Sequence, residues 1–190
     1  MSLITVKDAT LRYGVTSALS GVSLSLNPGE KIALIGPSGS GKTTLLRLLG
    51  LQEKPTSGNV VTLGCDLAGN CATSIRETRS KIGMLPQDLG LVANLRVIQN
   101  IILGRSGTRN FLRTCRDLLF PSKTDRDEIF ATLERLDIAE KIYDRTDSLS
   151  GGQRQRICIA RSIALNPKLI ICDEPVSALD VSIQSQILNL

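Results

Sequence analysis

The octapeptide GPSGSGKT occupies residues 36–43 and fits the pattern GxxxxGK[ST] at every position. It follows a continuously apolar run, Ile32–Ile35, which predicts a strand buried on both faces, and it precedes Thr43–Leu51, whose leucines predict a helix. A glycine-rich loop in that setting lets backbone N–H groups converge on phosphate oxygens, and the helix N-terminus adds partial positive charge. We therefore expect a phosphate site made of Gly36, Pro37, Ser38, Gly39, Ser40, Gly41, Lys42 and Thr43.

Two of these residues have side chains suited to the ligand. Lys42 is long enough to reach the β- and γ-phosphates of a nucleotide, and Thr43 offers a hydroxyl to Mg²⁺. A second apolar run, Leu169–Cys172, predicts another buried strand, and Asp173 and Glu174 follow it directly. An aspartate at a strand end next to a phosphate loop is placed to hold Mg²⁺, while the adjacent glutamate is placed to orient and deprotonate a water molecule.

The remaining pattern predicts the fold class. Residues 1–30 alternate apolar and polar side chains between glycine turns, which predicts a small antiparallel sheet. Strand-like and helix-like segments alternate over most of the chain, with Asp127–Tyr143 the clearest helix, so we expect an α/β protein with a parallel sheet. With 190 residues and no interdomain linker, the chain is expected to form one domain.

Composition excludes several classes of function. Apolar residues make up 42% and charged residues 22%, which is ordinary for a globular protein and excludes wholesale disorder. The sequence contains no histidine, which excludes Ser-His-Asp catalysis and histidine metal ligands, and aromatic residues reach only 3%, too few for a single-stranded nucleic-acid platform. The five cysteines include no CxxC pair, and we expect them to be reduced and mostly buried.

The positive charge is concentrated in one segment. The whole chain carries +5, from 23 basic and 18 acidic residues, whereas residues 105–126 hold six basic and two acidic residues, a net +4. A helix there would place Phe111, Leu112, Cys115, Leu118 and Leu119 on one face and Arg109, Arg113 and Arg116 on the other. The segment is typical of a solvated surface helix, and the alternative is a contact with an acidic partner or anionic headgroups.

A third motif, Leu149-Ser150-Gly151-Gly152-Gln153, leads to a family. By itself it predicts a capped helix start whose first N–H groups stay open to an anion. Together with the phosphate loop and the Asp173–Glu174 strand end, in this order, it resembles the ATP-binding subunits of ABC transporters over essentially the whole chain. The resemblance implies a P-loop NTPase fold with a RecA-like core, an antiparallel β subdomain and an inserted helical subdomain at about 88–160.

The resemblance also implies residue roles. Tyr13 is similar to the aromatic residue that stacks on adenine, Thr44 belongs with the phosphate loop in the ATP site, and Gln87 is similar to the glutamine that touches Mg²⁺ and the membrane subunits. Glu174 would be the catalytic residue, Asp173 would join Thr43 and Gln87 at the metal, and Asp180 would lie in the loop at the dimer interface. A partner subunit's ATP would contact Ser150, Gly151, Gly152 and Gln153.

The resemblance further implies partners and a location. Two copies would form a homodimer around ATP and Mg²⁺, bound to membrane permease subunits and served indirectly by a periplasmic or surface binding protein, at the cytoplasmic face of the cell membrane. No nucleic-acid partner is expected. The family has a histidine downstream of the catalytic glutamate that this sequence lacks, so we expect a C-terminally truncated cassette.

The subtype depends on two stretches. Residues 91–105 and 133–156 look most like ATPases of phosphonate importers, and residues 177–190 look more like those of peptide or nickel importers. We favour phosphonate import, because the longer match lies in the helical subdomain, where subtypes differ. The alternatives are a peptide or nickel importer ATPase, a non-transport ABC ATPase and a nucleotide-binding module.

Overall fold

The computed structural model describes residues 2–69, 71, 74–108 and 110–173 of the chain. Their contacts divide the chain into two compact units, Met1–Ile82 and Gly83–Leu190. Among the described residues, the structure contains no helix long and apolar enough to cross a membrane.

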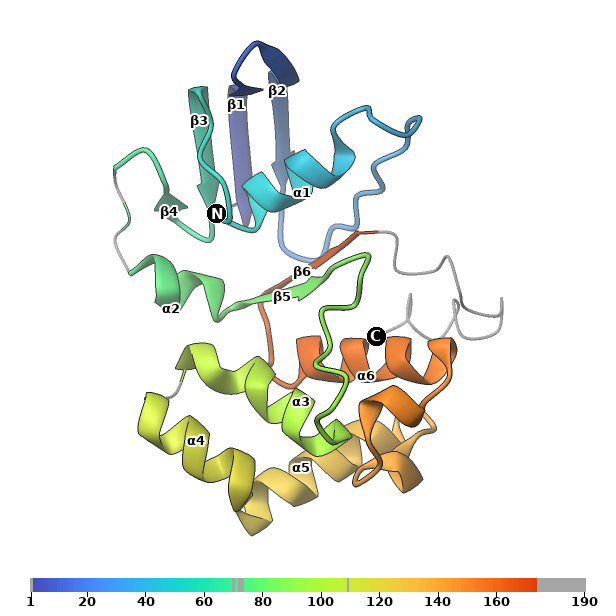
Figure 1. The fold of residues 1–190 in the computed structure, drawn as a ribbon. Coiled ribbons are helices and arrows are strands. Elements are labelled where there is room, and N and C mark those ends of the chain that lie inside the picture. The colour runs from blue at the N-terminus through green and yellow to red at the C-terminus, as the bar shows by residue number, and fades with distance from the viewer. Residues whose placement is uncertain (1, 70, 72–73, 109, 174–190) are drawn as a thin grey trace. The chain divides into compact units, whose positions relative to one another are not determined.

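A four-stranded antiparallel sheet is the central element of the first unit (Figure 1). Strand β1 (Ile4–Tyr13) lies between β2 (Thr16–Leu26) and β3 (Ser57–Thr62), and the short β4 (Cys65–Asp66) extends the sheet beyond β3. The sheet predicted from the alternating sequence is confirmed here, and Ile4, Val6, Ala9 and Leu11 of β1 are buried.

Two helices complete the first unit. Helix α1 (Lys42–Leu49) contacts β2 and β3 and buries Leu45, Leu48 and Leu49, while the short α2 (Ile75–Arg79) begins at Ser74, whose side chain accepts a hydrogen bond from the backbone N–H of Glu77. The predicted helix after the phosphate loop is therefore confirmed, and the β1–β3 strands give it a face to pack against.

One predicted strand of this unit is wrong. The described residues 31–37 form neither helix nor strand, and Ile32 and Ile35 are 52% and 95% exposed. An apolar run becomes a strand only when neighbouring strands accept its backbone hydrogen bonds, and no such pairing forms along this run among the described residues.

The second unit is mainly helical. It contains α3 (Val97–Gly104), α4 (Phe111–Leu119), α5 (Lys123–Glu134) and α6 (Gly151–Ile163), with 3₁₀ turns at Arg105–Thr108, Ala139–Lys141 and Thr146–Ser148. Strand β5 (Ile82–Leu85), which starts at the boundary between the units, pairs with β6 (Leu169–Cys172). Helix α3 contacts α4, α5 and α6, and apolar side chains of α3, α5 and α6 form one core around fully buried residues such as Ile101, Ile129 and Ile157.

The helix predicted over Asp127–Tyr143 is confirmed in its first half, and the prediction is wrong for its second half. Helix α5 ends at Glu134, because Asp137 adopts a left-handed φ of 58° and the backbone N–H of Ile138 donates to the carbonyl of Leu133 at 3.1 Å. This turn places the Ile138 side chain, 1% exposed, into the core. The helix therefore ends in a left-handed turn, after which Ile138 joins the core.

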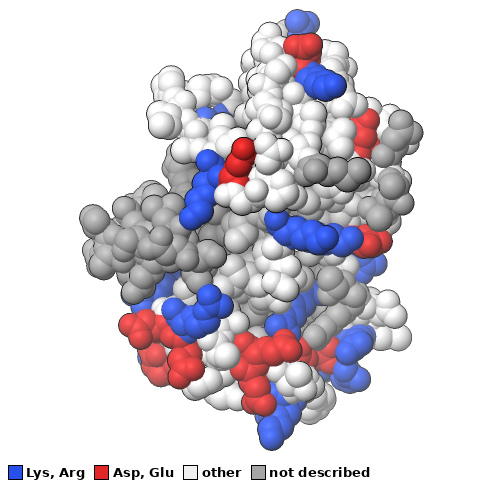
Figure 2. Space-filling model, turned by 180° about the vertical axis from the view of Figure 1, so that it is seen from behind, with Lys and Arg blue, Asp and Glu red and all other residues white. Residues whose placement is uncertain are grey.

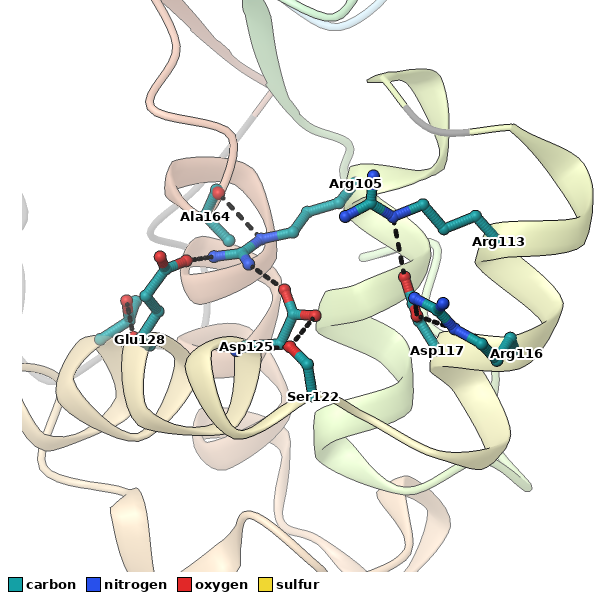
Figure 3. A network of polar contacts seen from close by, with 9 residues as sticks. Arg105, Arg113, Arg116, Asp117, Ser122, Asp125, Glu128 and Ala164 are labelled. Carbon is teal, nitrogen blue, oxygen red and sulfur yellow. Dashed lines mark hydrogen bonds and ion pairs between the residues drawn. The ribbon is translucent and has the colours of Figure 1, made fainter.

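Helix α4 forms as expected, but its apolar face points outward. Phe111 and Leu112 are 79% and 80% exposed, whereas the polar Thr114 and Asp117 are buried. Arg113 and Arg116 both reach the Asp117 carboxylate, and Arg116 does so at 2.6 Å. The buried carboxylate is thereby neutralised by two arginines whose side chains are mostly in solvent (Figure 3).

Much of the local positive charge is paired within the protein. Arg105, with a side chain 11% exposed, contacts the carboxylates of Asp125 at 2.8 Å and Glu128 at 2.9 Å, and it donates to the carbonyl of Ala164 (Figure 3). Figure 2 likewise shows lysine and arginine side chains next to aspartate and glutamate side chains. Arg105 thus connects the end of α3 to α5 and to the end of α6, whereas Arg113 and Arg116 pair with Asp117 within α4.

The expectation that all cysteines are reduced is also wrong. A disulfide joins Cys65 and Cys71, whose Cα atoms lie 4.2 Å apart. The turn after β4 brings the two residues opposite each other as an isolated antiparallel bridge, which their spacing of six residues does not reveal. Cys115, Cys158 and Cys172 are free thiols, and Cys158 is buried.

Candidate functional site

The predicted phosphate loop leads directly into α1. Residues 36–40 are exposed, and Gly39 and Gly41 have φ values of 80° and 89°, in the left-handed region. A Cβ on Gly41 would lie 2.5 Å from the carbonyl oxygen of Ala18 on β2, so glycine is required both by conformation and by space. The loop is thus an open turn of backbone fixed against the sheet.

The lysine of the motif lies over this loop. Lys42 is the first residue of α1, and its Nζ donates to the carbonyl oxygens of Gly36 and Pro37 at 2.9 Å each. Residues 42–45 carry no acidic side chain that would compete with an anion at the helix N-terminus. The arrangement therefore combines a cation and the positive end of a helix next to an exposed loop, which suits a phosphate group.

Tyr13 ends β1 with its side chain 51% exposed, as a residue that stacks on a base requires. Its hydroxyl donates to the carboxylate of Glu53, which follows α1. This hydrogen bond is the main reason that the pKa of Tyr13 is raised, and a hydrogen bond with Thr44 acts in the opposite direction. Thr43 and Thr44 are half-buried in the first turn of α1.

The second unit carries the remaining described site residues. Gln87 is exposed in a turn just after β5. That turn is held by Arg161 of α6, whose guanidinium donates to the carbonyl oxygens of Leu89 at 2.7 Å and Gly90 at 2.6 Å. Helix α6, which begins with the Ser-Gly-Gly-Gln motif, is thereby connected to the segment that follows Gln87.

The Ser-Gly-Gly-Gln motif forms the predicted cap. Ser150 Oγ accepts a hydrogen bond from the backbone N–H of Gln153 at 3.3 Å, and the Gln153 side chain accepts one from the backbone N–H of Ser150 at 2.9 Å. A Cβ added to Gly151 or Gly152 would meet no other described atom within 4 Å. The helix start is therefore accessible to a ligand or partner, although the reciprocal cap satisfies two of its N–H groups.

Asp173 follows β6, as the sequence predicts. Its backbone N–H donates to the carbonyl of Leu85 on β5 at 2.9 Å, and the residue is 7% exposed. A carboxylate in that position is held by the end of the two-stranded sheet. The predicted catalytic Glu174 and the predicted interface residue Asp180 lie outside the described residues.

The site residues thus fall into two groups. The first unit brings the phosphate loop, Lys42 and Tyr13 onto one sheet and helix, and the second unit carries Gln87, Asp173 and the Ser-Gly-Gly-Gln motif. Sequence reasoning missed Glu53 and Arg161. Glu53 is 40 residues from Tyr13, and Arg161 is about 70 residues from the turn that it holds, so no local pattern could have indicated either contact.

Comparison with known proteins agrees with these motifs. The sequence profile described as ABC transporter matches residues 19–177. The chain belongs to the ABC transporter family. The phosphonates import ATP-binding protein PhnC of Wolinella succinogenes is 39% identical over 189 residues, which cover 99% of this chain and 68% of that protein. The protein with the same description from Anaeromyxobacter dehalogenans is 40% identical over 177 residues, 93% of this chain and 35% of that protein.

Solved structures show the same fold. The dimeric structure of a bacterial ABC transporter cassette matches with a TM-score of 0.84 and 30% identity, covering 98% of this chain and 80% of that one. A dimeric post-hydrolysis state of an ATP-binding cassette bound to ADP and Pi matches with a TM-score of 0.77 and 29% identity. This ABC transporter family member therefore has the α/β P-loop fold of the cassettes.

Proposed function

We propose that this ABC family chain binds ATP with Mg²⁺ and hydrolyses it as the ATP-binding subunit of an importer, with a phosphonate as the imported substrate. The observation that carries ATP binding is the phosphate loop, in which the Lys42 ammonium lies over an exposed glycine turn at the start of α1. The phosphonate assignment rests on relatives described as phosphonates import ATP-binding proteins.

Each residue has a definite task in this proposal. The backbone N–H groups of the loop and the Lys42 ammonium bind and orient the β- and γ-phosphates. Tyr13 presents its exposed ring to the adenine base. Glu174, from its place in the motif, orients and deprotonates the attacking water.

The residues assigned to Mg²⁺ have suitable donor atoms. Thr43 offers a hydroxyl, Gln87 an amide oxygen and Asp173 a buried carboxylate, and oxygen atoms are the ligands that Mg²⁺ prefers. Bound Mg²⁺ would neutralise charge that develops on the phosphate oxygens during transfer.

We also propose that two copies form the active unit. The Ser-Gly-Gly-Gln start of α6 is accessible at Gly151 and Gly152, which suits an anion supplied from outside the subunit. The dimeric cassette among the matching structures supports this arrangement. Permease subunits in the membrane are the partners that an import function requires, and a surface binding protein would act through them.

Calorimetry with Lys42→Ala tests nucleotide binding. The substitution removes the ammonium at the loop, so we expect ATP binding to be lost, whereas Lys7→Ala, at an exposed position on β1, should leave it unchanged. Unchanged ATP affinity in Lys42→Ala would remove the loop from the nucleotide site. In Glu174→Gln we expect binding to persist and turnover to stop, so that an ATP-bound dimer accumulates in light scattering.

Uptake assays separate the importer classes. In cells that depend on this chain, uptake of labelled methylphosphonate should fall in Lys42→Ala, while uptake of a labelled dipeptide and of Ni²⁺ should not. Loss of dipeptide or Ni²⁺ uptake instead would identify the alternative importers. If Lys42→Ala lowers the uptake of none of the three compounds, the result would favour a non-transport ATPase or a nucleotide-binding module.

A further inference from the structure

The ring of Tyr13, which we assign to the adenine base, is held by a carboxylate whose role the sequence does not indicate. Tyr13 lies at the end of β1, where it pairs with Thr16 across the first turn, and half of its side chain is in solvent. Packing alone therefore leaves the ring free to change rotamer. Its hydroxyl, however, donates to one carboxylate oxygen of Glu53.

The carboxylate is itself held in place. Glu53 lies in the connection from α1 to β3, and its second oxygen is 3.8 Å from a guanidinium nitrogen of Arg47 in the last turn of α1. The same connection is fixed to β1, because Thr56 donates its backbone N–H to the carbonyl of Thr10 at 2.8 Å and accepts a hydrogen bond from the backbone N–H of Arg12 at 3.0 Å. The connection that carries Glu53 is therefore anchored to β1 at Thr56, three residues further along the chain.

The groups that act on the Tyr13 hydroxyl belong to, or follow, the helix that begins with the phosphate loop. Arg47 and Thr44 are residues of α1, whose first residue is Lys42, and Glu53 lies four residues beyond the last residue of this helix, Leu49. A tyrosine phenol is protonated at neutral pH and can therefore donate, and the hydrogen bond to Glu53 is the main cause that raises the pKa of Tyr13 further. The ring and the phosphate loop are thus tied to the same helix.

We propose that Glu53 is a positioning residue that fixes the Tyr13 ring at a set distance from the phosphate loop, so that the base and the triphosphate of ATP are recognised together. The proposal rests on the ATP-binding function proposed above. Holding the ring in its bound orientation before ATP arrives removes the entropy cost of ordering it at the moment of binding. Glu53 does not touch the phosphates, so its effect should be confined to the base.

The test compares two ligands on the full chain. Calorimetry in Mg²⁺ buffer measures the affinity for ATP, which uses the ring and the loop, and for inorganic tripolyphosphate, which uses the loop alone. We expect Glu53→Ala to weaken ATP binding about two- to tenfold, the range set by one side chain that must be ordered on binding, and to leave tripolyphosphate binding unchanged. Glu77→Ala, which breaks an exposed ion pair with Lys81, is the matched control and should affect neither ligand.

Three further variants separate positioning from simple support of the fold. Glu53→Gln keeps an acceptor for the Tyr13 hydroxyl and should restore most of the ATP affinity. Tyr13→Phe keeps the ring but removes the donor, so it should match Glu53→Ala. The double variant Tyr13→Phe with Glu53→Ala should bind ATP no more weakly than either single variant, because both substitutions break the same hydrogen bond.

Several results would overturn the proposal. A role through the Tyr13 ring would be excluded if Glu53→Ala left the ATP affinity unchanged. It would also be excluded if the effects of Glu53→Ala and Tyr13→Phe added in the double variant, or if Glu53→Ala lowered the affinities for ATP and tripolyphosphate equally. A wild-type chain that binds tripolyphosphate as tightly as ATP would exclude it as well. A wild-type chain that binds neither ligand would overturn the proposed ATP-binding function itself, which is a different outcome.

Discussion

Arg161→Ala is the substitution whose consequences follow most directly from the structure. The Arg161 guanidinium donates to the carbonyl oxygens of Leu89 and Gly90, at 2.7 and 2.6 Å, and thereby holds the turn that follows Gln87. Both of these turn residues have left-handed φ values, 61° for Leu89 and 54° for Gly90. A leucine in this conformation is unfavourable by itself, so the turn depends on contacts from outside it.

The magnitude can be estimated from these two bonds. A hydrogen bond from a charged donor contributes about 1.5–3 kcal/mol, and the lower end applies here because water can replace the donor at the partly exposed carbonyls. We therefore expect Arg161→Ala to lower the free energy of unfolding by about 2–3 kcal/mol. For a chain of this length that corresponds to a fall in Tm of roughly 4–12 °C.

Two measurements check this expectation. Thermal unfolding followed by circular dichroism measures the change in global stability. Amide hydrogen exchange measures the local change, and in Arg161→Ala the exchange rate of residues 87–92 should increase more than that of α3. Arg154→Ala is the control, because Arg154 lies on the same helix with an exposed side chain, and it should change stability by less than about 0.5 kcal/mol. Equal losses in the two variants, or unchanged exchange in the turn, would refute the idea that Arg161 holds the segment after Gln87.

Four other substitutions have expected outcomes. Gly41→Ala places a Cβ 2.5 Å from the carbonyl of Ala18 at a φ of 89°, so calorimetry should show loss of ATP binding, and normal affinity would contradict the loop geometry. Leu112→Ser, at an 80% exposed position, should change the unfolding free energy by less than about 0.5 kcal/mol in urea titration, whereas Leu133→Ala, fully buried, should cost about 2–5 kcal/mol. Burial raises the pKa of the Cys172 thiol to about 11, so the folded state keeps this proton longer than the unfolded chain, and stability should fall as pH rises from about 9 to 11. Cys172→Ala should lessen that fall in urea titrations across this pH range, and an unchanged slope would show that the thiol does not contribute.

Features built from neighbouring residues were predictable from the sequence. The phosphate loop, the Ser150–Gln153 cap and the alternating strand β1 each depend on contacts within a few residues or on one face of one element. A short window of sequence therefore contains all the residues needed to predict each of them. The family and the positions of most site residues follow from the order of these motifs.

Other features were decided by segments far apart in the chain. Ile32–Ile35 has the composition of a buried strand but no strand to pair with it among the described residues, and α4, which packs against α3, leaves Phe111 and Leu112 exposed. The Tyr13–Glu53 hydrogen bond spans 40 residues, and the Arg161 contacts span about 70. The sequence alone determined which local structures can form, because propensity, capping and glycine freedom act over a few residues. Only the tertiary structure decided which faces are buried and which polar groups meet, because burial and hydrogen-bond partners come from residues that the chain brings together after those local structures have formed.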